Sequence, residues 1–211
     1  MASNETPHSS SAVGINFSNP QFICSVGANT APEDLYYVVF VGRSNAGKSS
    51  VINTLCGGRY ARVAKAPGRT RLINLFRLGG NSSAATLADL PGYGYAAVSK
   101  QEQRSWAPRM LRFLQTADIR CLAVVVDCRR GIGQMDMQLL DLYAAREAPA
   151  IIILNKSDKL NQSQKYAAIA AVRDTINVPV FLFSALKKKG VAEVQGYISS
   201  CLLAAPTEPL Q

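Results

Sequence analysis

The chain has 211 residues, of which 48% are hydrophobic and 18% are charged, so its length suits one domain and its composition suits a folded core rather than a disordered chain. No Lys or Arg precedes Arg43, which argues against a secretory signal or a mitochondrial presequence. The longest unbroken apolar runs, at residues 36–41 and 121–126, are far shorter than the roughly 20 residues that a membrane-spanning helix needs. We therefore expect no insertion into a membrane.

Histidine and cysteine content excludes several kinds of site. His8 is the only histidine, so no histidine is available in the folded part for a Ser-His-Asp triad, a general base or a zinc site. The cysteines are scattered and include no C-x-x-C pair, which argues against a disulfide framework or a zinc ribbon. Free thiols without an export signal predict a cytoplasmic protein whose cysteines are small core residues. They are Cys24, Cys56, Cys121, Cys128 and Cys201.

The net charge of +9 is concentrated in one stretch. Residues 35–88 contain no Asp or Glu, and a basic field of this kind attracts polyanions. The stretch therefore predicts a nucleic-acid partner, and a basic surface without a dedicated partner is the alternative. Its Lys and Arg residues are Arg43, Lys48, Arg59, Arg62, Lys65, Arg69, Arg71 and Arg77.

In chain order, residues 1–19 are rich in Ser, Asn and small residues and predict a flexible leader, followed by one domain at residues 20–205 and a tail at residues 206–211. We expect strands at residues 36–41, 72–78, 86–90, 122–127, 151–154 and 180–183. We expect helices that begin near Lys48, Lys100, Gly133, Ser163 and Gly190. This alternation predicts an α/β fold with a mainly parallel six-stranded sheet and helices on both faces. Ligands of such sheets bind at the carboxyl ends of the strands.

The first motif directly follows the first expected strand. Residues 42–49 read G-R-S-N-A-G-K-S and match the phosphate-loop pattern G-x-x-x-x-G-K-[ST] at every fixed position. The two glycines allow a backbone that turns its N–H groups toward phosphate oxygens, and the following helix adds partial positive charge at its N-terminus. Lys48 can reach the β- and γ-phosphates, and the Ser49 hydroxyl can bind Mg²⁺.

Three further segments follow expected strands. Residues 89–92 read D-L-P-G, which places a carboxylate near the metal through a water and the Gly92 N–H near the γ-phosphate, although D-x-x-G alone is often a plain turn. Residues 155–158 read N-K-S-D, and the Asp158 carboxylate can accept hydrogen bonds from the two neighbouring donors of guanine. Adenine lacks those donors, so an unpaired carboxylate would reject it at a cost of about 1–3 kcal/mol. Residues 183–185 could contact the guanine O6 through their backbone.

Residues 67–71 read P-G-R-T-R and lie between the first helix and the second strand. A threonine here, Thr70, can complete the Mg²⁺ shell only while a γ-phosphate is present. We therefore expect this loop to order with GTP and to relax after hydrolysis. The alternative is a basic loop whose threonine has no such role.

The order of these motifs resembles the EngB (YihA/YsxC) family of bacterial GTPases, within the TRAFAC class. The matching runs are GRSNAGKSSVIN from Gly42, PGRTRLIN from Pro67, DLPGYGYA from Asp89, NKSDKL from Asn155 and FSALKKKG from Phe183. The resemblance covers about residues 32–203 and implies a Ras-like P-loop GTPase fold. It also implies slow GTP hydrolysis in a nucleotide-controlled switch that assists large ribosomal subunit assembly and is needed for normal cell division and septation.

The resemblance also implies roles for single residues. Lys48, Thr70 and Gly92 would be catalytic, and Ser49 and Thr70 would ligate Mg²⁺. The partners would be GTP or GDP, ribosomal RNA and large-subunit assembly particles, and we expect a monomer. The nucleotide would be contacted by Gly42, Arg43, Ser44, Asn45, Ala46, Gly47, Lys48, Ser49, Gly68, Arg69, Thr70, Arg71, Leu72, Asp89, Leu90, Pro91, Gly92, Asn155, Lys156, Ser157, Asp158, Phe183, Ser184 and Ala185. The family commonly has Thr in place of Asn155 and often a second Ser in place of Ala185.

Tyr93 occupies the position after D-x-x-G, where Ras-type enzymes have a glutamine that orients the attacking water. We therefore expect slow intrinsic hydrolysis. We hypothesise that Asn45 binds K⁺ beside the phosphates, because related GTPases with this asparagine do so; the alternative is that Asn45 only shapes the loop. The run from Lys187 to Lys189 is a second candidate for contact with RNA, and Trp106 is either a base-stacking or a core residue.

Two other functions stay open. One is a P-loop kinase of a small metabolite or nucleoside, although N-K-x-D has no role in such an enzyme. The other is a non-catalytic scaffold that binds RNA and holds GTP as part of its structure.

Overall fold

Strands and helices alternate in the computed structural model, which describes residues 14–27, 32–61, 72–80, 84–94, 108, 110–146 and 148–204. The strands are β1 (Ile15–Val26), β2 (Tyr36–Gly42), β3 (Ile73–Gly80), β4 (Ala85–Asp89), β5 (Asp118–Asp127), β6 (Ala150–Asn155) and β7 (Val180–Leu182). The helices are α1 (Lys48–Leu55), α3 (Gln134–Ala144), α4 (Gln162–Arg173) and α5 (Val191–Leu203), with the 3-10 turn η1 (Ser157–Lys159). Residues 110–116 are also helical. All six expected strands are present, and β5 begins earlier than expected.

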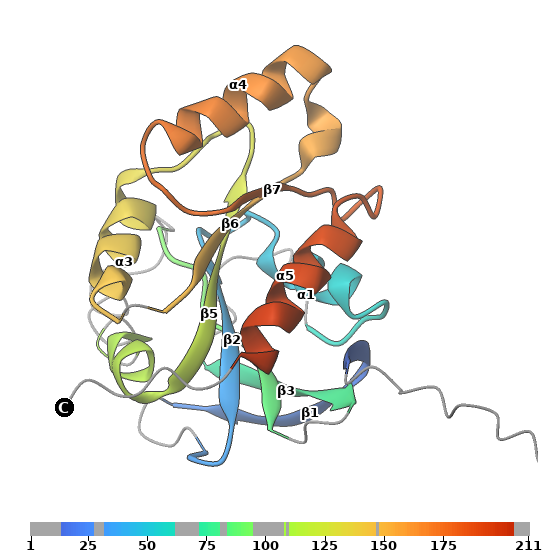
Figure 1. Ribbon diagram of the computed structural model, residues 1–211, viewed down its shortest axis with the longest axis vertical. Coiled ribbons are helices and arrows are strands. Elements are labelled where there is room, and N and C mark those ends of the chain that lie inside the picture. Colours follow the sequence, from blue (N-terminus) through green and yellow to red (C-terminus); the bar gives the residue numbers. More distant parts are fainter. Residues whose placement is uncertain are drawn as a thin grey trace, which may run out of the picture.

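The strands form one sheet in the order β1-β3-β4-β2-β5-β6-β7 (Figure 1). The pairs β2–β4, β2–β5, β5–β6 and β6–β7 are parallel, whereas β1–β3 and β3–β4 are antiparallel. The sheet of the described residues is therefore mainly parallel, as expected, but it has seven strands instead of six.

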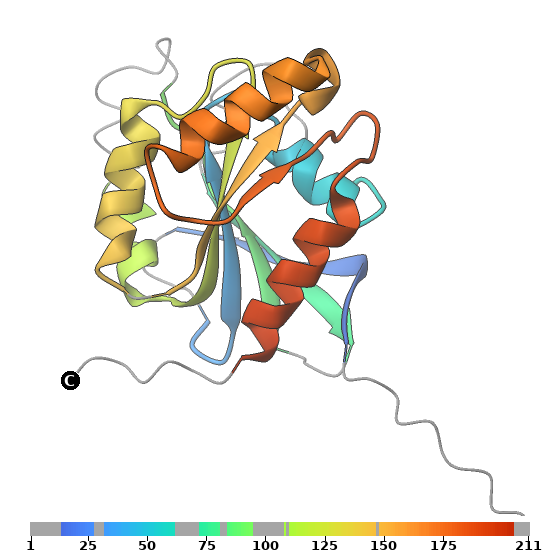
Figure 2. The ribbon, with the colours of Figure 1, turned by 45° about the horizontal axis from the view of Figure 1, so that its top comes forward.

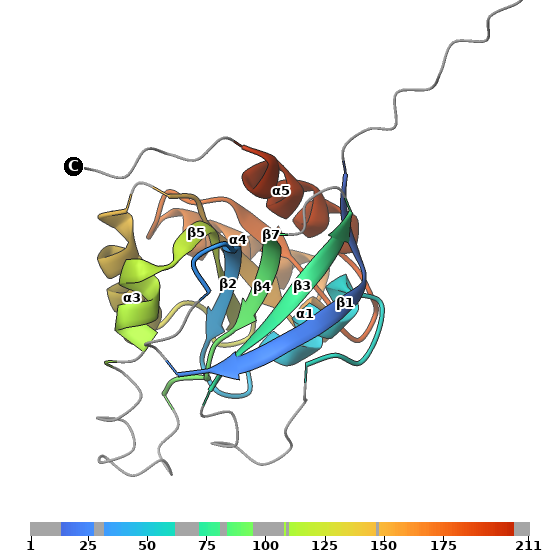
Figure 3. The ribbon, with the colours of Figure 1, turned by 90° about the horizontal axis from the view of Figure 1, so that it is seen from below.

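The additional strand corrects the expected leader. Residues 15–19 do not belong to a leader, because Ile15–Val26 forms β1 and pairs with β3 (Figure 3). Its register shifts twice along the pair, and Asn19 has a positive φ of 54° immediately before Pro20. An edge strand tolerates such an interruption because it has a partner on one side only.

Two apolar cores lie on the two faces of the sheet. Tyr37, Val39 and Val41 of β2 pack with buried residues of α3, and the intervening Val38 and Phe40 pack with buried residues of α1 and α5. This alternation is the period of two that a strand buried on both faces must have. Figure 2 shows α3 (yellow) and α5 (red) on opposite sides of the sheet.

The expected motifs meet at the carboxyl edge of the parallel strands. Gly42, Asp89 and Asn155 are the last residues of β2, β4 and β6, and Asp127 is the last residue of β5. Because β3 runs antiparallel to β4 and Asn74 pairs with Asp89, β3 begins at this same edge. The fold therefore brings segments from five strands to one rim.

Some expectations fall outside the described residues. These are residues 1–13 of the leader, the helix start near Lys100, the site residues Gly68, Arg69, Thr70 and Arg71, Trp106, and the tail at residues 206–211. Four cysteines are buried as expected and Cys24 is half-buried. Within the described ranges, we find no helix long and apolar enough to cross a membrane.

Candidate functional site

The phosphate loop lies between β2 and α1, which is the strand–loop–helix context that its motif requires. Gly47 joins the loop to α1 with a left-handed φ of 94°. A Cβ atom at this position would lie 2.4 Å from the Asn155 side-chain nitrogen. Glycine is therefore required here both by the backbone conformation and by the close approach of the N-K-x-D segment.

Lys48 and Ser49, at the start of α1, both contact Asp89 at the end of β4. The Lys48 ammonium forms a buried ion pair with one carboxylate oxygen of Asp89. The Ser49 hydroxyl donates to the other oxygen at 3.3 Å. The lysine and hydroxyl of the phosphate loop thus share a carboxylate supplied by the D-x-x-G segment.

The rest of the D-x-x-G segment packs against the phosphate loop. A Cβ atom on Gly92 would lie 3.2 Å from both the N and Cα atoms of Ser44, so the two backbones are in close contact. The next residue, Tyr93, donates its N–H to the Gly42 oxygen at 3.3 Å and accepts the Ser44 N–H at 2.8 Å. The backbone at Gly92 is consequently held beside the loop that sequence analysis assigns to phosphates.

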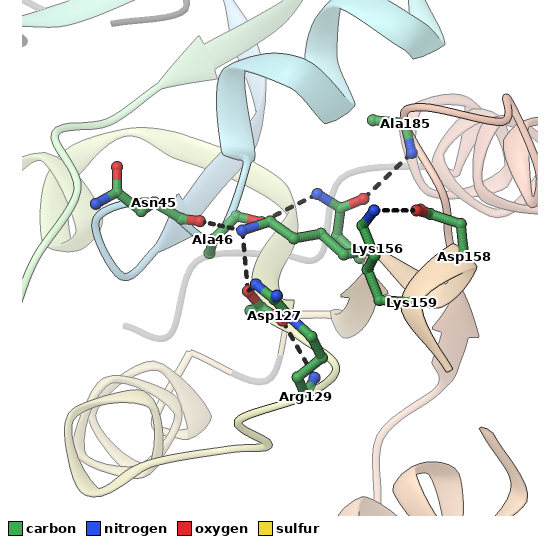
Figure 4. A network of polar contacts seen from close by, with 9 residues as sticks. Asn45, Ala46, Asp127, Arg129, Lys156, Asp158, Lys159 and Ala185 are labelled. Carbon is green, nitrogen blue, oxygen red and sulfur yellow. Dashed lines mark hydrogen bonds and ion pairs between the residues drawn. The ribbon is translucent and has the colours of Figure 1, made fainter. Parts of the chain in front are cut away.

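The N-K-x-D segment is bonded to the other side of the same loop (Figure 4). The Asn155 side chain donates to the Ala46 oxygen at 3.0 Å and accepts the Ala185 N–H at 3.2 Å. Lys156 has a left-handed φ of 65°, and its ammonium donates to the Asn45 oxygen at 2.6 Å. One segment therefore links the phosphate loop to the turn after β7.

Asp127, at the end of β5, is a site residue that sequence analysis missed. Its carboxylate accepts hydrogen bonds from the Lys156 ammonium at 2.9 Å and from the Arg129 guanidinium at 2.6 Å. Burial opposes ionisation of Asp127, but these donors outweigh burial and hold the pKa of the carboxyl well below its ordinary value. Its position offered a signal, because it ends a parallel strand at the same edge as the motifs.

Asp158 lies in η1 with its carboxylate oriented by the turn after β7. The Ser184 hydroxyl donates to it at 2.5 Å, and this hydrogen bond lowers the pKa of the Asp158 carboxyl. The Lys159 ammonium lies 3.7 Å from the other carboxylate oxygen. Asp158 is therefore held as an anionic hydrogen-bond acceptor beside the turn at Ala185.

Other expected contact residues have mainly packing roles. The side chains of Leu90 and Phe183 are fully buried in the two cores, so only their backbones are available near the site. Ser157 is buried and donates its N–H to the Phe183 oxygen at 3.0 Å. Leu72 is exposed immediately before β3.

The donors near the start of α1 fit Mg²⁺. This ion prefers oxygen ligands and usually takes only one or two from protein, with phosphate oxygens and waters completing its shell. The Ser49 hydroxyl and the Asp89 carboxylate supply such oxygens next to Lys48. No group of three or more His, Cys, Asp or Glu side chains suited to a metal occurs in the part of the chain that the structure describes.

Comparison with known proteins agrees with this geometry. The sequence pattern of the family described as "50S ribosome-binding GTPase" matches residues 37–156. The chain is 42% identical, over 91% of its length, to the probable GTP-binding protein EngB of Azoarcus sp. (strain BH72), of which it covers 95%. It is 38% identical, over 90% of its length, to that of Pasteurella multocida (strain Pm70), of which it covers 96%.

Solved structures share the fold. The crystal structure of a probable GTP-binding protein engB aligns with 79% of this chain and 98% of its own, with a TM-score of 0.64 and 24% identity. The structure of Era in complex with MgGDPNP and nucleotides of 16S ribosomal RNA aligns with 83% of this chain and 58% of its own, with a TM-score of 0.64 and 23% identity. Both support the Ras-like arrangement of the sheet and helices.

Proposed function

The chain belongs to the EngB family of GTP-binding proteins, which are GTPases of Ras-like fold, and we propose that it is a slow, nucleotide-controlled switch acting in large ribosomal subunit assembly. The observation that carries the site assignment is the direct bonding of the phosphate loop to both D-x-x-G, through Asp89, and N-K-x-D. The finer role in assembly, and with it a requirement in cell division and septation, rests on the family resemblance. The proposed cytoplasmic location rests on the free cysteines and on the lack of an export signal in the sequence.

In this proposal the phosphates lie on the backbone of residues 42–49. The N–H groups of the loop and of the first turn of α1 would bind phosphate oxygens, and Lys48 would neutralise charge on the β- and γ-phosphates. The Asp89 carboxylate already pairs with Lys48, so a bound triphosphate would compete for that ammonium. Gly92, whose backbone packs against Ser44, would donate its N–H to the γ-phosphate.

Guanine recognition is assigned to Asp158. Its carboxylate can accept hydrogen bonds from guanine N1–H and the 2-amino group, and the Ser184 hydrogen bond favours its ionised form. Asn155 supports this end of the site because it joins Ala46 to Ala185. Adenine would leave the Asp158 carboxylate without its two donors.

Magnesium would be held by the Ser49 hydroxyl, and by Thr70 when a γ-phosphate is present. Asp89 would orient the metal through a water, since its carboxylate lies next to Ser49. When bound, the metal would neutralise charge on the β- and γ-phosphates. Thr70 and the rest of residues 67–71 would form the segment that responds to the terminal phosphate.

The slow hydrolysis that we propose is attributed to Tyr93, which stands where Ras-type enzymes have a glutamine. Its hydroxyl donates to the buried Asp136 carboxylate at 2.6 Å, so the side chain is directed into the protein. Tyr93 would therefore not orient the attacking water as the glutamine of Ras-type enzymes does. K⁺ bound beside Asn45 would supply positive charge instead. Lys156 binds the backbone oxygen of Asn45, and the Asn45 side chain points away from that contact (Figure 4). The side-chain amide oxygen is therefore not used by Lys156 and would be the ligand for K⁺.

Ribosomal RNA is the proposed partner of the basic residues. Arg59 and the run from Lys187 to Lys189 are exposed, whereas Lys48 is buried and belongs to the nucleotide site. The matched family is described as ribosome-binding, which supports this assignment. Contacts to phosphates would weaken steeply as salt rises, and binding that is independent of salt would count against an electrostatic interface.

The test is a titration of GTP, GDP and ATP against the wild type and Asp158→Asn. We expect the wild type to prefer guanine nucleotides, and Asp158→Asn to lose at least about tenfold in GTP affinity, which is about 1.4 kcal/mol, without losing ATP affinity. Asp174→Asn is the matched control, because Asp174 is exposed at the end of α4. Equal affinity of the wild type for GTP and ATP would contradict the proposal.

A further inference from the structure

Tyr93 forms a buried contact with Asp136, a residue outside the motifs that sequence analysis identified. The Tyr93 hydroxyl donates to one carboxylate oxygen of Asp136 at 2.6 Å, and the Gly133 N–H donates to the other at 2.8 Å. Both side chains are buried, and Asp136 lies in the first turn of α3. A buried carboxylate needs such donors, because burying it without them would be costly.

The same tyrosine is fixed at its other end to the phosphate loop. Its N–H and C=O are hydrogen-bonded to Gly42 and Ser44, respectively. Tyr93 therefore connects the backbone of the phosphate loop to the start of α3 through three hydrogen bonds. Its neighbour Gly92, which is proposed to sense the γ-phosphate, packs with its backbone against Ser44, to which Tyr93 is bonded.

The chemistry of the pair favours a fixed direction for the hydrogen bond. Burial and the neighbouring Asp136 carboxylate raise the pKa of the Tyr93 hydroxyl well above its ordinary value. The hydroxyl consequently stays protonated and donates, while the carboxylate accepts from Tyr93 and from the backbone of Gly133. This contact directs the Tyr93 ring toward α3, so the residue is held at its hydroxyl as well as at its backbone.

We propose that Asp136 is a positioning residue for GTP hydrolysis, which acts by holding Tyr93 and thereby fixing the Gly92 N–H at the γ-phosphate position. The inference rests on the proposed role of Gly92. GDP has no γ-phosphate, so loss of the Tyr93–Asp136 hydrogen bond affects GTP binding and turnover and leaves GDP binding unchanged. Movement of the D-x-x-G segment with the nucleotide would also be transmitted to the start of α3.

The experiment uses the full chain and the variants Tyr93→Phe, Asp136→Asn and their combination. Tyr93→Phe removes the hydroxyl and keeps the buried ring, whereas Asp136→Asn keeps an amide oxygen that can accept the Gly133 N–H. Tyr143→Phe is the matched control: Tyr143 is also buried and lies on α3, and its hydroxyl has no hydrogen-bond partner among the described residues. Turnover and KM for GTP, affinities for GDP and a non-hydrolysable GTP analogue, and melting temperatures are measured for each protein.

We expect Tyr93→Phe and Asp136→Asn each to lower kcat for GTP by at least about fivefold, or to lower the affinity for the GTP analogue relative to GDP by the same factor. The affinity for GDP is expected to stay within twofold of the wild type. The double variant is expected to match Tyr93→Phe within twofold, because Asp136 acts only through the Tyr93 hydroxyl, which both of these proteins lack. Tyr143→Phe is expected to behave as the wild type.

A purely structural role for the pair predicts a different result. The inference would be overturned if the variants lost GTP and GDP affinity equally. It would also be overturned if folded Tyr93→Phe and Asp136→Asn kept the turnover and nucleotide preference of the wild type. Additive losses in the double variant would also overturn it. A wild-type protein that does not hydrolyse GTP would instead refute the proposed function itself, and the inference with it.

Discussion

The Nζ atom of Lys156 lies 2.6 Å from the backbone oxygen of Asn45, so the N-K-x-D segment holds the phosphate loop directly. The two residues are 111 positions apart in the chain. The same ammonium also donates to Asp127 at 2.9 Å. The ends of β5 and β6 and the loop after β2 are thus joined by one cation, which makes the base and phosphate ends of the site a single unit.

Replacement of Lys156 is expected to weaken nucleotide binding in general. Lys156→Met keeps an unbranched side chain of similar length and removes the ammonium, which leaves the Asn45 oxygen without this donor. A hydrogen bond from a charged group contributes about 1.5–3 kcal/mol, so we expect GTP and GDP affinities to fall together by about tenfold to a hundredfold. Calorimetric titration measures both affinities.

Lys159→Met is the control for this prediction. Lys159 is a neighbouring and more exposed lysine whose ammonium lies 3.7 Å from Asp158, a distance at which an exposed ion pair contributes little. We expect its nucleotide affinities to stay within about threefold of the wild type. Equal affinities for Lys156→Met and Lys159→Met would show that the bridge to the phosphate loop does not matter for binding.

Asp127 is expected to make stability sensitive to acid. Its carboxyl has a lowered pKa in the folded protein, through Arg129 and Lys156, compared with about 3.9 in an unfolded chain. Such a group contributes stability above its unfolded-state pKa, and that contribution is lost as the pH falls and the carboxyl is protonated. We expect Asp127→Asn to have a lower melting temperature than the wild type at pH 7 and a smaller further decrease between about pH 5 and about pH 3.

Thermal denaturation at several pH values checks this prediction, with Asp141→Asn as the control. Asp141 is an exposed residue of α3 and lies outside the contacts of the site. Its replacement is expected to leave the pH dependence close to that of the wild type. The same acid sensitivity in Asp127→Asn and in the wild type would mean that Arg129 and Lys156 do not stabilise the Asp127 carboxylate.

Much of the sheet could be predicted because its central strands are covered on both faces. That burial requires continuous apolar runs, such as residues 121–126 of β5. β1 could not be predicted in this way, because Asn19 and Pro20 interrupt it and only a few of its side chains are buried. β1 forms because it pairs with the edge of β3, and the two register shifts in this pair mean that apolar and polar residues do not alternate regularly in its sequence.

The motifs of the site could also be predicted, since each depends on residues that are close together in sequence. The contacts that join one motif to another could not be predicted from the sequence. Lys156 follows Asp127 by 29 positions, and Asp136 follows Tyr93 by 43. Neither aspartate belongs to a short pattern with its partner. The position of Asp127 at the end of a parallel strand marks it as a candidate, but its contact with Lys156 and the contact of Asp136 with Tyr93 are visible only in the folded structure.

Potassium is expected to stimulate hydrolysis through Asn45. Asn45 has a left-handed φ of 68°, which glycine adopts without strain, so Asn45→Gly removes the side-chain amide and keeps the loop conformation. We expect the wild type to turn over GTP about tenfold faster in K⁺ than in Na⁺, a difference of about 1.4 kcal/mol in the barrier. Asn45→Gly is expected to lose this difference and to keep the rate in Na⁺. Equal wild-type rates in the two salts would exclude a K⁺ site.

Gly190 is expected to be essential for the stability of the turn that presents residues 183–185. It lies at the start of α5 with a φ of 80°, and a Cβ atom there would lie 2.2 Å from the Leu182 backbone oxygen. Backbone strain of this kind costs about 1–3 kcal/mol, so we expect Gly190→Ala to lower the melting temperature by about 2–12 °C, at about 2–4 °C per kcal/mol for a chain of this size.

Gly196→Ala in the same helix should have the opposite effect. Gly196 lies inside α5, and nothing lies within 4 Å of the position that its Cβ would occupy. Alanine restricts the unfolded chain and favours the helix, so we expect a gain of about 0.4–1 kcal/mol. Thermal denaturation of both variants separates the two effects. Equal melting temperatures for Gly190→Ala and Gly196→Ala would contradict the prediction. Alanine would then be tolerated equally at the positive φ of Gly190 and inside the helix, so the left-handed turn before α5 would not constrain the chain.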